Sequence, residues 1–414
     1  MSNHAAYLHV ADKLACQLVR DAIWDQHRCN WLGWSMELDQ GNWVPAYRSF
    51  AYDLYSGTSG IALFLAELYP HTGDNLQKKT AFAAINQALS IYQNSGTINP
   101  SFYAGAAGLA YTLWRSAFLC DHFPWLAKAK EIMLQILHAD ISPGSLDVIS
   151  GSAGLIPWLL RAAHEFGTAE YIEHAIKHAD SLIAQAVHYE YGWAWDTMQI
   201  AGQAPLTGHS HGVAGIVTAL LEVFKQTEDK RYLDAAQQGL RYERHFYSQT
   251  YQNWPDLRLG GQAESQADTY NLAWCHGAPG IGLSRWRNNQ ILPNDHEIQS
   301  ELENALQTTM RNLSLPWNTQ VGNYSLCHGA AGNAELLLLA GQSLQRQDCL
   351  DIAEKVAYEG WHFYSQSNSP WPCGVAGCGE TPNLMLGLAG IGLFYLRMAK
   401  PDTVPSALLI PGGI

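Results

Sequence analysis

The stretch GTSGIALFLAEL, residues 57–68, places two glycines three residues apart and follows them with an apolar run. The same pattern, a GxxG motif and then an apolar segment, occurs seven times along the chain. The first glycines of the seven motifs are Gly57, Gly105, Gly151, Gly212, Gly277, Gly329 and Gly387. Because these glycines recur at similar intervals over the whole sequence, the pattern indicates a fold made from one repeated unit.

Each motif is flanked by two kinds of predicted helix. The segment after a motif is apolar nearly all round, which is typical of a helix buried on most sides. The segment before it is amphipathic: in WLAKAKEIMLQIL, residues 125–137, the side chains of Leu126, Ala129 and Met133 fall on one helical face. The predicted amphipathic helices are 6–24, 79–93, 125–137, 170–188, 231–246, 297–313 and 346–364.

Seven outer amphipathic helices paired with seven inner apolar helices predict an all-α fold, an (α/α)7 toroid. A single pair cannot bury both of its apolar faces, so the pairs are expected to stack and close. Alternation with a period of two residues is nearly absent, and extensive sheet is not expected. We expect one domain spanning residues 1–414, with the seven loops that precede the motifs gathered at one end of the barrel.

The composition limits the class of protein. The chain has 414 residues, of which 47% are hydrophobic and 15% charged, and its net charge of −13 disfavours binding to nucleic acid. No signal peptide and no long apolar segment are evident, so no membrane span and a cytoplasmic location are expected. In that reducing compartment, clustered cysteines more often bind a metal than form disulfides.

The tripeptide CHG occurs twice, at Cys275–His276 and at Cys327–His328, each time directly before a GxxG glycine. The predicted repeat places both thiols at helix N-termini, where a thiolate is favoured. Two thiolates and one imidazole form a three-ligand zinc site with an open fourth position, which is the catalytic arrangement. His211 also precedes a GxxG motif, so the residues alone leave the third ligand open among His211, His276 and His328.

Three further positions are candidates for weaker reasons. Asp147 lies four residues before Gly151 and could either cap a helix or reach the site. His209 is expected to be a loop residue that makes a hydrogen bond. Cys373 and Cys378 lie on the same side of the predicted repeat, but their spacing fits a second zinc site poorly.

These motifs resemble those of the lanthionine synthetase C-like cyclases. The resemblance covers nearly the whole chain and is carried by YDLYSGTSGIALFLAEL, DVISGSAGL, GHSHGVAGI, WCHGAPGIGLSR and LCHGAAGNAELLL. It implies a toroid of seven helix pairs with one zinc ion, held by Cys275, Cys327 and His328. By the same resemblance the catalytic residues are His211 and Asp147.

Three neighbouring residues, His276, Asn271 and His209, are expected to be second-sphere groups or substrate contacts. Asn271 stands where the nisin-type members of the family carry an active-site arginine, so no role of that arginine transfers to this chain. The motifs are closer to those in the cyclase domain of the bifunctional lanthipeptide synthetases. Because the sequence starts at its own methionine, we expect a cyclase that stands alone.

The implied reaction is the addition of a cysteine thiol to dehydroalanine or dehydrobutyrine, which closes a thioether ring. The substrate would be a precursor peptide dehydrated in trans by a separate dehydratase. Two alternatives use the same residues: addition of glutathione to dehydroamino acids in proteins, and a zinc-stabilised scaffold that binds peptides without turnover. A toroidal glycosidase would need two facing carboxylates, and a zinc-dependent prenyltransferase would need a basic diphosphate pocket and six helix pairs.

Overall fold

The computed structural model describes residues 3–39, 42–142, 144–258, 269–317 and 322–412. Within these residues the protein is mainly helical, with fourteen α-helices and three two-stranded sheets. Parts of the long loops predicted before Gly277 and Gly329, namely residues 259–268 and 318–321, lie outside the described residues.

Seven helices begin directly after the first glycine of a GxxG motif, as predicted, and each is buried over most of its length. We call them the GxxG helices: α2 Thr58–Thr72, α4 Ala106–Leu119, α6 Ser152–Phe166, α8 Val213–Thr227, α10 Ala278–Ile291, α12 Ala330–Ser343 and α14 Leu388–Ala399. Although the GxxG helices are apolar, no helix in the described part of the chain is long and apolar enough to cross a membrane.

The amphipathic helices alternate with the GxxG helices along the chain. They are α1 His4–Asp21, α3 Asn75–Asn94, α5 Pro124–Ile136, α7 Glu170–Ala184, α9 Lys230–Phe246, α11 His296–Leu313 and α13 Gln347–Gly360, the last continued by the π-helix η3 Trp361–Gln366. The prediction of helix 6–24 extends too far. Helix α1 ends at Asp21, and Ala22 has an extended backbone. Residues 23–25 then pair with residues 28–30 as a small hairpin.

The three sheets are antiparallel hairpins. Strand β1 Ile23–Asp25 pairs with β2 Arg28–Asn30, β3 Leu32–Asp39 with β4 Asn42–Ser49, and β5 Val187–Tyr189 with β6 Gly192–Ala194. The β3–β4 hairpin is the longest, in register from Leu32 opposite Ser49 to Asp39 opposite Asn42. The sequence analysis did not identify it. In the described residues the sheets stay small, as expected for this fold class.

The glycines of the motif have a steric cause. In six of the seven motifs the loop folds back onto the first turn of the helix, so the second glycine packs against the backbone carbonyl six residues earlier. A Cβ atom at Gly332 would lie 1.8 Å from the carbonyl oxygen of Leu326, and one at Gly154 would lie 1.9 Å from that of Val148. Only glycine permits this approach.

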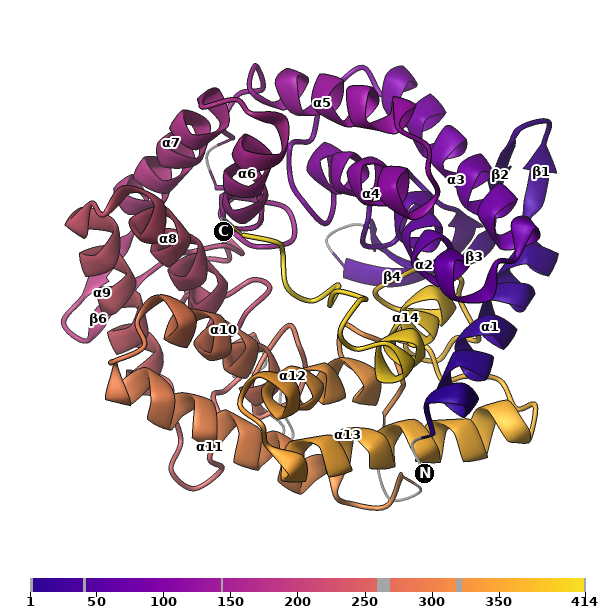
Figure 1. Cartoon of the computed structure of the whole chain (residues 1–414). Coiled ribbons are helices and arrows are strands. Elements are labelled where there is room, and N and C mark those ends of the chain that lie inside the picture. The colour runs from indigo at the N-terminus through magenta and orange to yellow at the C-terminus, as the bar shows by residue number, and fades with distance from the viewer. Residues whose placement is uncertain (1–2, 40–41, 143, 259–268, 318–321, 413–414) are drawn as a thin grey trace. The chain divides into compact units, whose positions relative to one another are not determined.

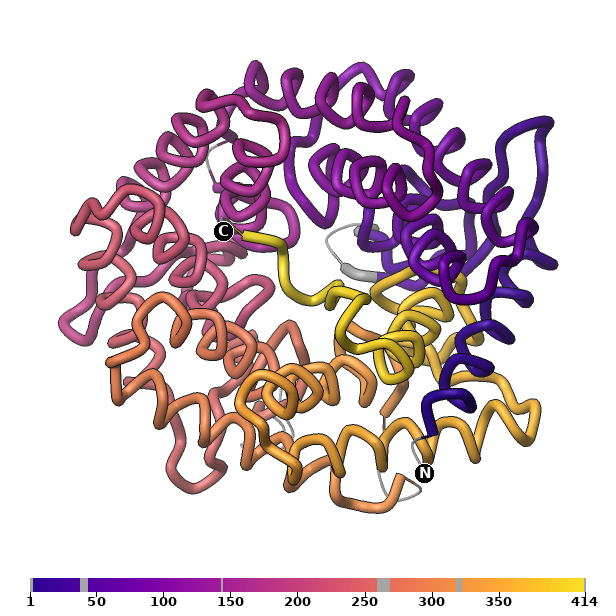
Figure 2. Tube along the Cα trace, in the orientation of Figure 1, coloured from indigo at the N-terminus to yellow at the C-terminus, as the bar shows by residue number. Residues whose placement is uncertain are grey.

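The described chain forms two compact units. Unit 1 comprises residues 1–99, 104–134 and 313–408, and unit 2 comprises residues 100–103, 135–312 and 409–414. In unit 1, α2 packs on α3, α12 packs on α13, and the first helix, α1, packs on the last, α14 (Figures 1 and 2). In unit 2, α6 packs on α7 and α8 packs on α9. Among these pairs, a GxxG helix packs on the amphipathic helix that follows it, except α14, which is covered by α1. The expectation of a single domain stays a prediction.

Candidate functional site

Six of the seven loops that precede the GxxG helices close in the same way. The first backbone N–H of the helix donates to the carbonyl oxygen six residues before the first glycine of the motif. The six pairs are Thr58 to Ala51, Ala106 to Asn99, Ser152 to Ser145, Val213 to Leu206, Ala330 to Asn323 and Leu388 to Thr381. Because these six loops close in the same way, residues that lie the same number of positions before the glycine have comparable places in their loops.

Neighbouring loops are joined through the backbone within each unit. In unit 1 the N–H of Cys327 donates to Met385 O at 2.9 Å, and the N–H of Met385 donates to Tyr55 O at 3.0 Å. In unit 2 the N–H of Val148 donates to Ser210 O at 3.0 Å, and the N–H of Ser210 donates to Cys275 O at 3.3 Å. The loops before α2, α12 and α14 therefore form one bonded set, and the loops before α6, α8 and α10 form another.

The loop before α12 presents Cys327 and His328. Cys327 is buried and accepts a hydrogen bond at Sγ from the Tyr55 hydroxyl at 3.0 Å, while His328 is exposed. The Nε2 atom of His328 lies 2.8 Å from the carbonyl oxygen of Gly374. A carbonyl can only accept a hydrogen bond, so Nε2 carries the proton and Nδ1 keeps its lone pair. Metal-binding histidines are commonly oriented in this way.

Gly374 belongs to the segment WPCGVAGCGE, residues 371–380, where the sequence analysis found no clear role for the two cysteines. A Cβ atom at Gly374 would lie 2.8 Å from Ser325 Oγ and 3.1 Å from His328 Cε1, so a larger residue would displace the histidine. Burial raises the pKa of the Cys373 thiol to about 12. The segment thus supplies a carbonyl group to the histidine, and its buried thiol stays protonated at neutral pH.

The loop before α10 presents the second CHG tripeptide differently. Cys275 is half-buried, whereas His276 is 2% exposed. The Nδ1 atom of His276 lies 3.9 Å from Asp256 Oδ1. Burial and the nearby Arg258 guanidinium lower the pKa of His276, which is therefore a neutral imidazole at pH 7.

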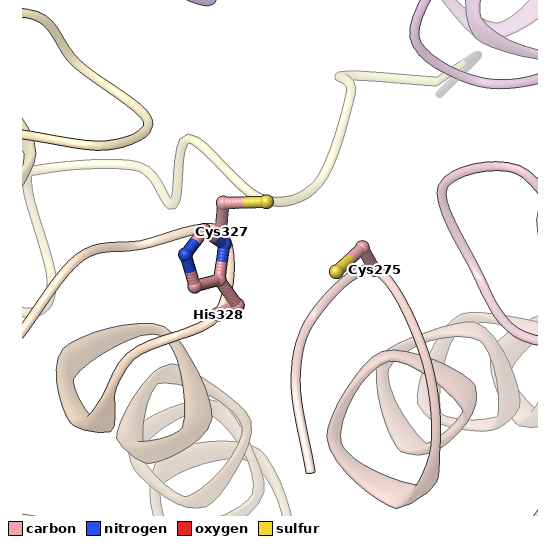
Figure 3. Close-up of side chains that lie close together, drawn as sticks. All are labelled: Cys275, Cys327 and His328. Atoms are coloured by element: carbon pink, nitrogen blue, oxygen red, sulfur yellow. The ribbon is translucent and has the colours of Figure 1, made fainter. Parts of the chain in front are cut away.

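The three predicted zinc ligands form one group. The sulfur atoms of Cys275 and Cys327 and a ring nitrogen of His328 all lie within 4.8 Å of one another (Figure 3). Tetrahedral zinc with two sulfur ligands and one nitrogen ligand holds these atoms about 3.5 Å apart, given its usual bond lengths. The set of donor atoms and the free Nδ1 of His328 fit a zinc ion that keeps one further coordination position.

Asp147 and His211 form a second pair of site residues, within unit 2. The His211 Nδ1–H donates to Asp147 Oδ2 at 2.6 Å. The other carboxylate oxygen, Oδ1, accepts from the N–H of Ser150 at 2.7 Å and from its hydroxyl at 3.0 Å. Asp147 therefore does not cap α6, whose N-cap is Gly151: one carboxylate oxygen stabilises the turn before the helix and the other accepts from a histidine. The Nε2 atom of His211 takes no part in this hydrogen bond.

The repeat offers a comparison for Asp147. Asp53 lies at the same distance from its glycine and accepts from the backbone N–H of Ser56 at 2.7 Å and of Gly57 at 3.2 Å. Burial raises the pKa of Asp53 despite these hydrogen bonds. No described histidine donates to this carboxylate, so Asp53 stabilises its turn only.

The remaining predicted positions have other surroundings. His209 is buried, and its Nδ1 lies 2.8 Å from Ser284 Oγ on α10. Burial lowers the pKa of His209 to about 4, and this histidine joins the loop before α8 to a neighbouring helix. Asn271 is exposed, and its carbonyl oxygen accepts from Asn253.

Asn253 is a residue that the sequence analysis missed. It is 2% exposed and makes four hydrogen bonds. Its Nδ2 donates to the carbonyl oxygens of Tyr270 and Asn271, and its Oδ1 accepts from the N–H groups of Trp254 and Ala278. At α10 the side chain of Asn253 thus takes the place of the backbone carbonyl that closes the other six loops.

A family model described as "Lanthionine synthetase C-like protein" matches residues 49–409. Two curated relatives come from Lactococcus lactis subsp. lactis. The lacticin 481/lactococcin biosynthesis protein LcnDR2 is 24% identical over 377 residues, which cover 86% of this chain and 36% of the relative. The nisin biosynthesis protein NisC is 24% identical over 310 residues, which cover 69% of this chain and 73% of the relative.

The solved structure of nisin cyclase matches with a TM-score of 0.64 and 18% sequence identity. The match covers 95% of this chain and 94% of that chain. A likeness of this extent shows the fold. The predicted fold class, the all-α toroid of helix pairs, is therefore confirmed.

Proposed function

Because the chain belongs to the lanthionine synthetase C-like family, as its motifs predicted, we propose that it is a zinc-dependent peptide cyclase. The substrate is a precursor peptide that contains dehydroalanine or dehydrobutyrine. A cysteine thiol of that peptide adds to the β-carbon, which forms a lanthionine or methyllanthionine ring. The names of the relatives, two of which refer to nisin, support this choice of substrate.

Cys275, Cys327 and His328 would hold one zinc ion. The observation that carries the proposal is the group of two thiols and one imidazole, in which His328 has Nε2 tied to Gly374 and Nδ1 free. When bound, zinc supplies a Lewis acid that favours the thiolate form of a cysteine. With two thiolate ligands and one neutral ligand, a catalytic site keeps one position for the substrate.

His211 and Asp147 handle the proton that the addition requires. As the sulfur bonds to the β-carbon, the α-carbon must receive a proton, and the S–H proton must leave. The hydrogen bond from Nδ1–H to Asp147 fixes the ring of His211 and stabilises its protonated form. Nε2 then faces away from the carboxylate and can deliver the proton to the α-carbon.

The test is a cyclisation assay on the zinc-loaded protein. A dehydrated peptide with one cysteine is incubated with the protein, treated with a thiol-alkylating reagent and weighed by mass spectrometry. The proposal predicts loss of alkylation at unchanged peptide mass, and Cys327→Ala should abolish both this activity and zinc binding. His211→Asn should keep zinc and slow the reaction.

Other outcomes identify the alternatives. A gain of one glutathione in mass, with glutathione present and the peptide cysteine still alkylated, would replace cyclisation by intermolecular thiol addition. Peptide binding with full alkylation at every time point would indicate a scaffold without turnover. Full cyclisation by the Cys327→Ala protein without zinc would contradict the role of the metal.

A further inference from the structure

Tyr55 occupies the position in the first motif that the two cysteines occupy in theirs, two residues before the first glycine. In unit 1 the backbone connects this position to Cys327 through Met385, by the two hydrogen bonds of 2.9 and 3.0 Å described above. The main chain of Tyr55 is therefore held relative to Cys327 by bonds that need no particular side chain. The motifs differ in the side chain at this position, which is tyrosine at residue 55 and cysteine at residues 275 and 327.

The side chain of Tyr55 uses this placement. Its hydroxyl donates to Cys327 Sγ at 3.0 Å, while Cys327 is only 4% exposed and the tyrosine is half-buried. A hydrogen bond to an ionised sulfur is charge-assisted and is stronger than one between neutral groups. Little water reaches Cys327, and this hydroxyl stabilises negative charge on the sulfur at a place where solvent does little.

We propose that Tyr55 is a positioning residue for the Cys327 thiolate, which fixes the direction of the sulfur and draws part of its negative charge away from the metal. This inference rests on the zinc binding proposed above. A sulfur that donates less charge leaves the ion a stronger Lewis acid.

The experiment compares Tyr55→Phe with a control from the same loop, Tyr52→Phe. The Tyr52 ring packs edge-on against Tyr92 at 5.6 Å between centroids. Each substitution removes only a hydroxyl from an aromatic ring. The full-length proteins are titrated with zinc against a chromophoric chelator, and with cobalt to record the sulfur-to-metal charge-transfer absorption. Thermal unfolding followed by circular dichroism checks that both variants fold.

Tyr55→Phe should weaken zinc binding about 10- to 100-fold, the usual cost of losing a group that orients a metal ligand. Its cobalt absorption should move to lower energy, because a sulfur without the hydrogen bond gives up electrons more easily. Tyr52→Phe should match the wild type in both measurements. Unchanged affinity and absorption in Tyr55→Phe would overturn this inference alone, whereas a wild-type protein that binds no zinc would overturn the proposed function as well.

Discussion

The two CHG tripeptides present the same residues in opposite ways. Before α12 the cysteine is buried and the histidine exposed, whereas before α10 the cysteine is half-buried and the histidine is 2% exposed. The backbone of the glycine that follows differs as well. Gly329 has an extended backbone with φ of −117°, while Gly277 has φ of 80°, which favours glycine.

The cause of this difference lies outside both motifs. The N–H of Ala330 bonds to a backbone carbonyl of its own loop, but the N–H of Ala278 bonds to the side chain of Asn253. The loop before α10 is thereby turned, so that its histidine faces the buried Asp256. Identical tripeptides can therefore expose different side chains. The way in which the loop closes decides which side chain is exposed, and the tripeptide itself does not.

The largest expected effect is on zinc affinity, and it distinguishes His328 from His276. His328→Ala should weaken zinc binding at least about 100-fold, because it removes a ligand and not only a supporting group. His276→Ala should leave zinc affinity close to that of the wild type. Chelator competition measures both. If the affinity losses were reversed between the two variants, the ligand assignment would be wrong.

The next effect concerns the acid–base pair. Asp147→Asn should lower kcat by about 10²- to 10⁴-fold, since an amide can accept from Ser150 but cannot stabilise a protonated His211. Zinc content should not change. The matched control is Asp53→Asn, which replaces the carboxylate that only stabilises its turn and should retain most of the activity. Equal losses of kcat in the two variants would leave Asp147 with a structural role alone.

A smaller effect tests the closure of the loop before α10. Asn253→Ala leaves the N–H groups of Trp254 and Ala278 without their acceptor, and should lower the free energy of unfolding by about 1–3 kcal/mol. Asn323, six residues before Gly329, accepts at Oδ1 from the N–H of Ser325. Asn323→Ala should cost less, about 1 kcal/mol. Urea unfolding of both variants measures the difference, and a larger loss for Asn323→Ala would refute this account of the loop.

The last effect is a dependence of stability on pH. With its pKa held near 4 by burial, His209 stays neutral in the folded chain between pH 6.5 and 4, while the unfolded chain binds the proton. The unfolded state then carries more protons, so the free energy of unfolding falls as pH falls through this range. His209→Gln should make this dependence shallower, by at most about 1.4 kcal/mol per pH unit. Parallel curves for the two proteins would contradict the prediction.

Most of the fold could be predicted from the sequence because the main steric requirement of the fold involves residues that are close together in the sequence. A glycine that packs against a carbonyl six residues earlier must recur in every copy, so the GxxG spacing located the start of each GxxG helix. The equal offsets of Cys275 and Cys327 predicted a shared ligand position for the same reason. The C-terminal end of helix α1 was predicted three residues too late, at residue 24 and not at Asp21, because the β1–β2 hairpin continues the apolar pattern of the helix.

The rest of the candidate site depends on contacts between segments distant in sequence. Gly374 contacts His328 through its backbone carbonyl group, and Tyr55 lies 272 positions from the Cys327 that it contacts. No pattern in the neighbouring sequence therefore identifies either residue. The residues alone could not rank His276 and His328, because the backbone at Gly277 depends on Asn253. That ranking came from the resemblance to the family and stays a prediction until the ligands are measured.

X-ray absorption at the zinc edge of the loaded protein tests the unequal use of the two CHG tripeptides most directly. The account predicts one zinc ion per chain with two sulfur ligands at about 2.3 Å and the scattering of a single imidazole, and a spectrum that His276→Ala leaves unchanged. Scattering from two imidazoles, reduced to one in His276→Ala, would show that both tripeptides bind the metal alike and would contradict it.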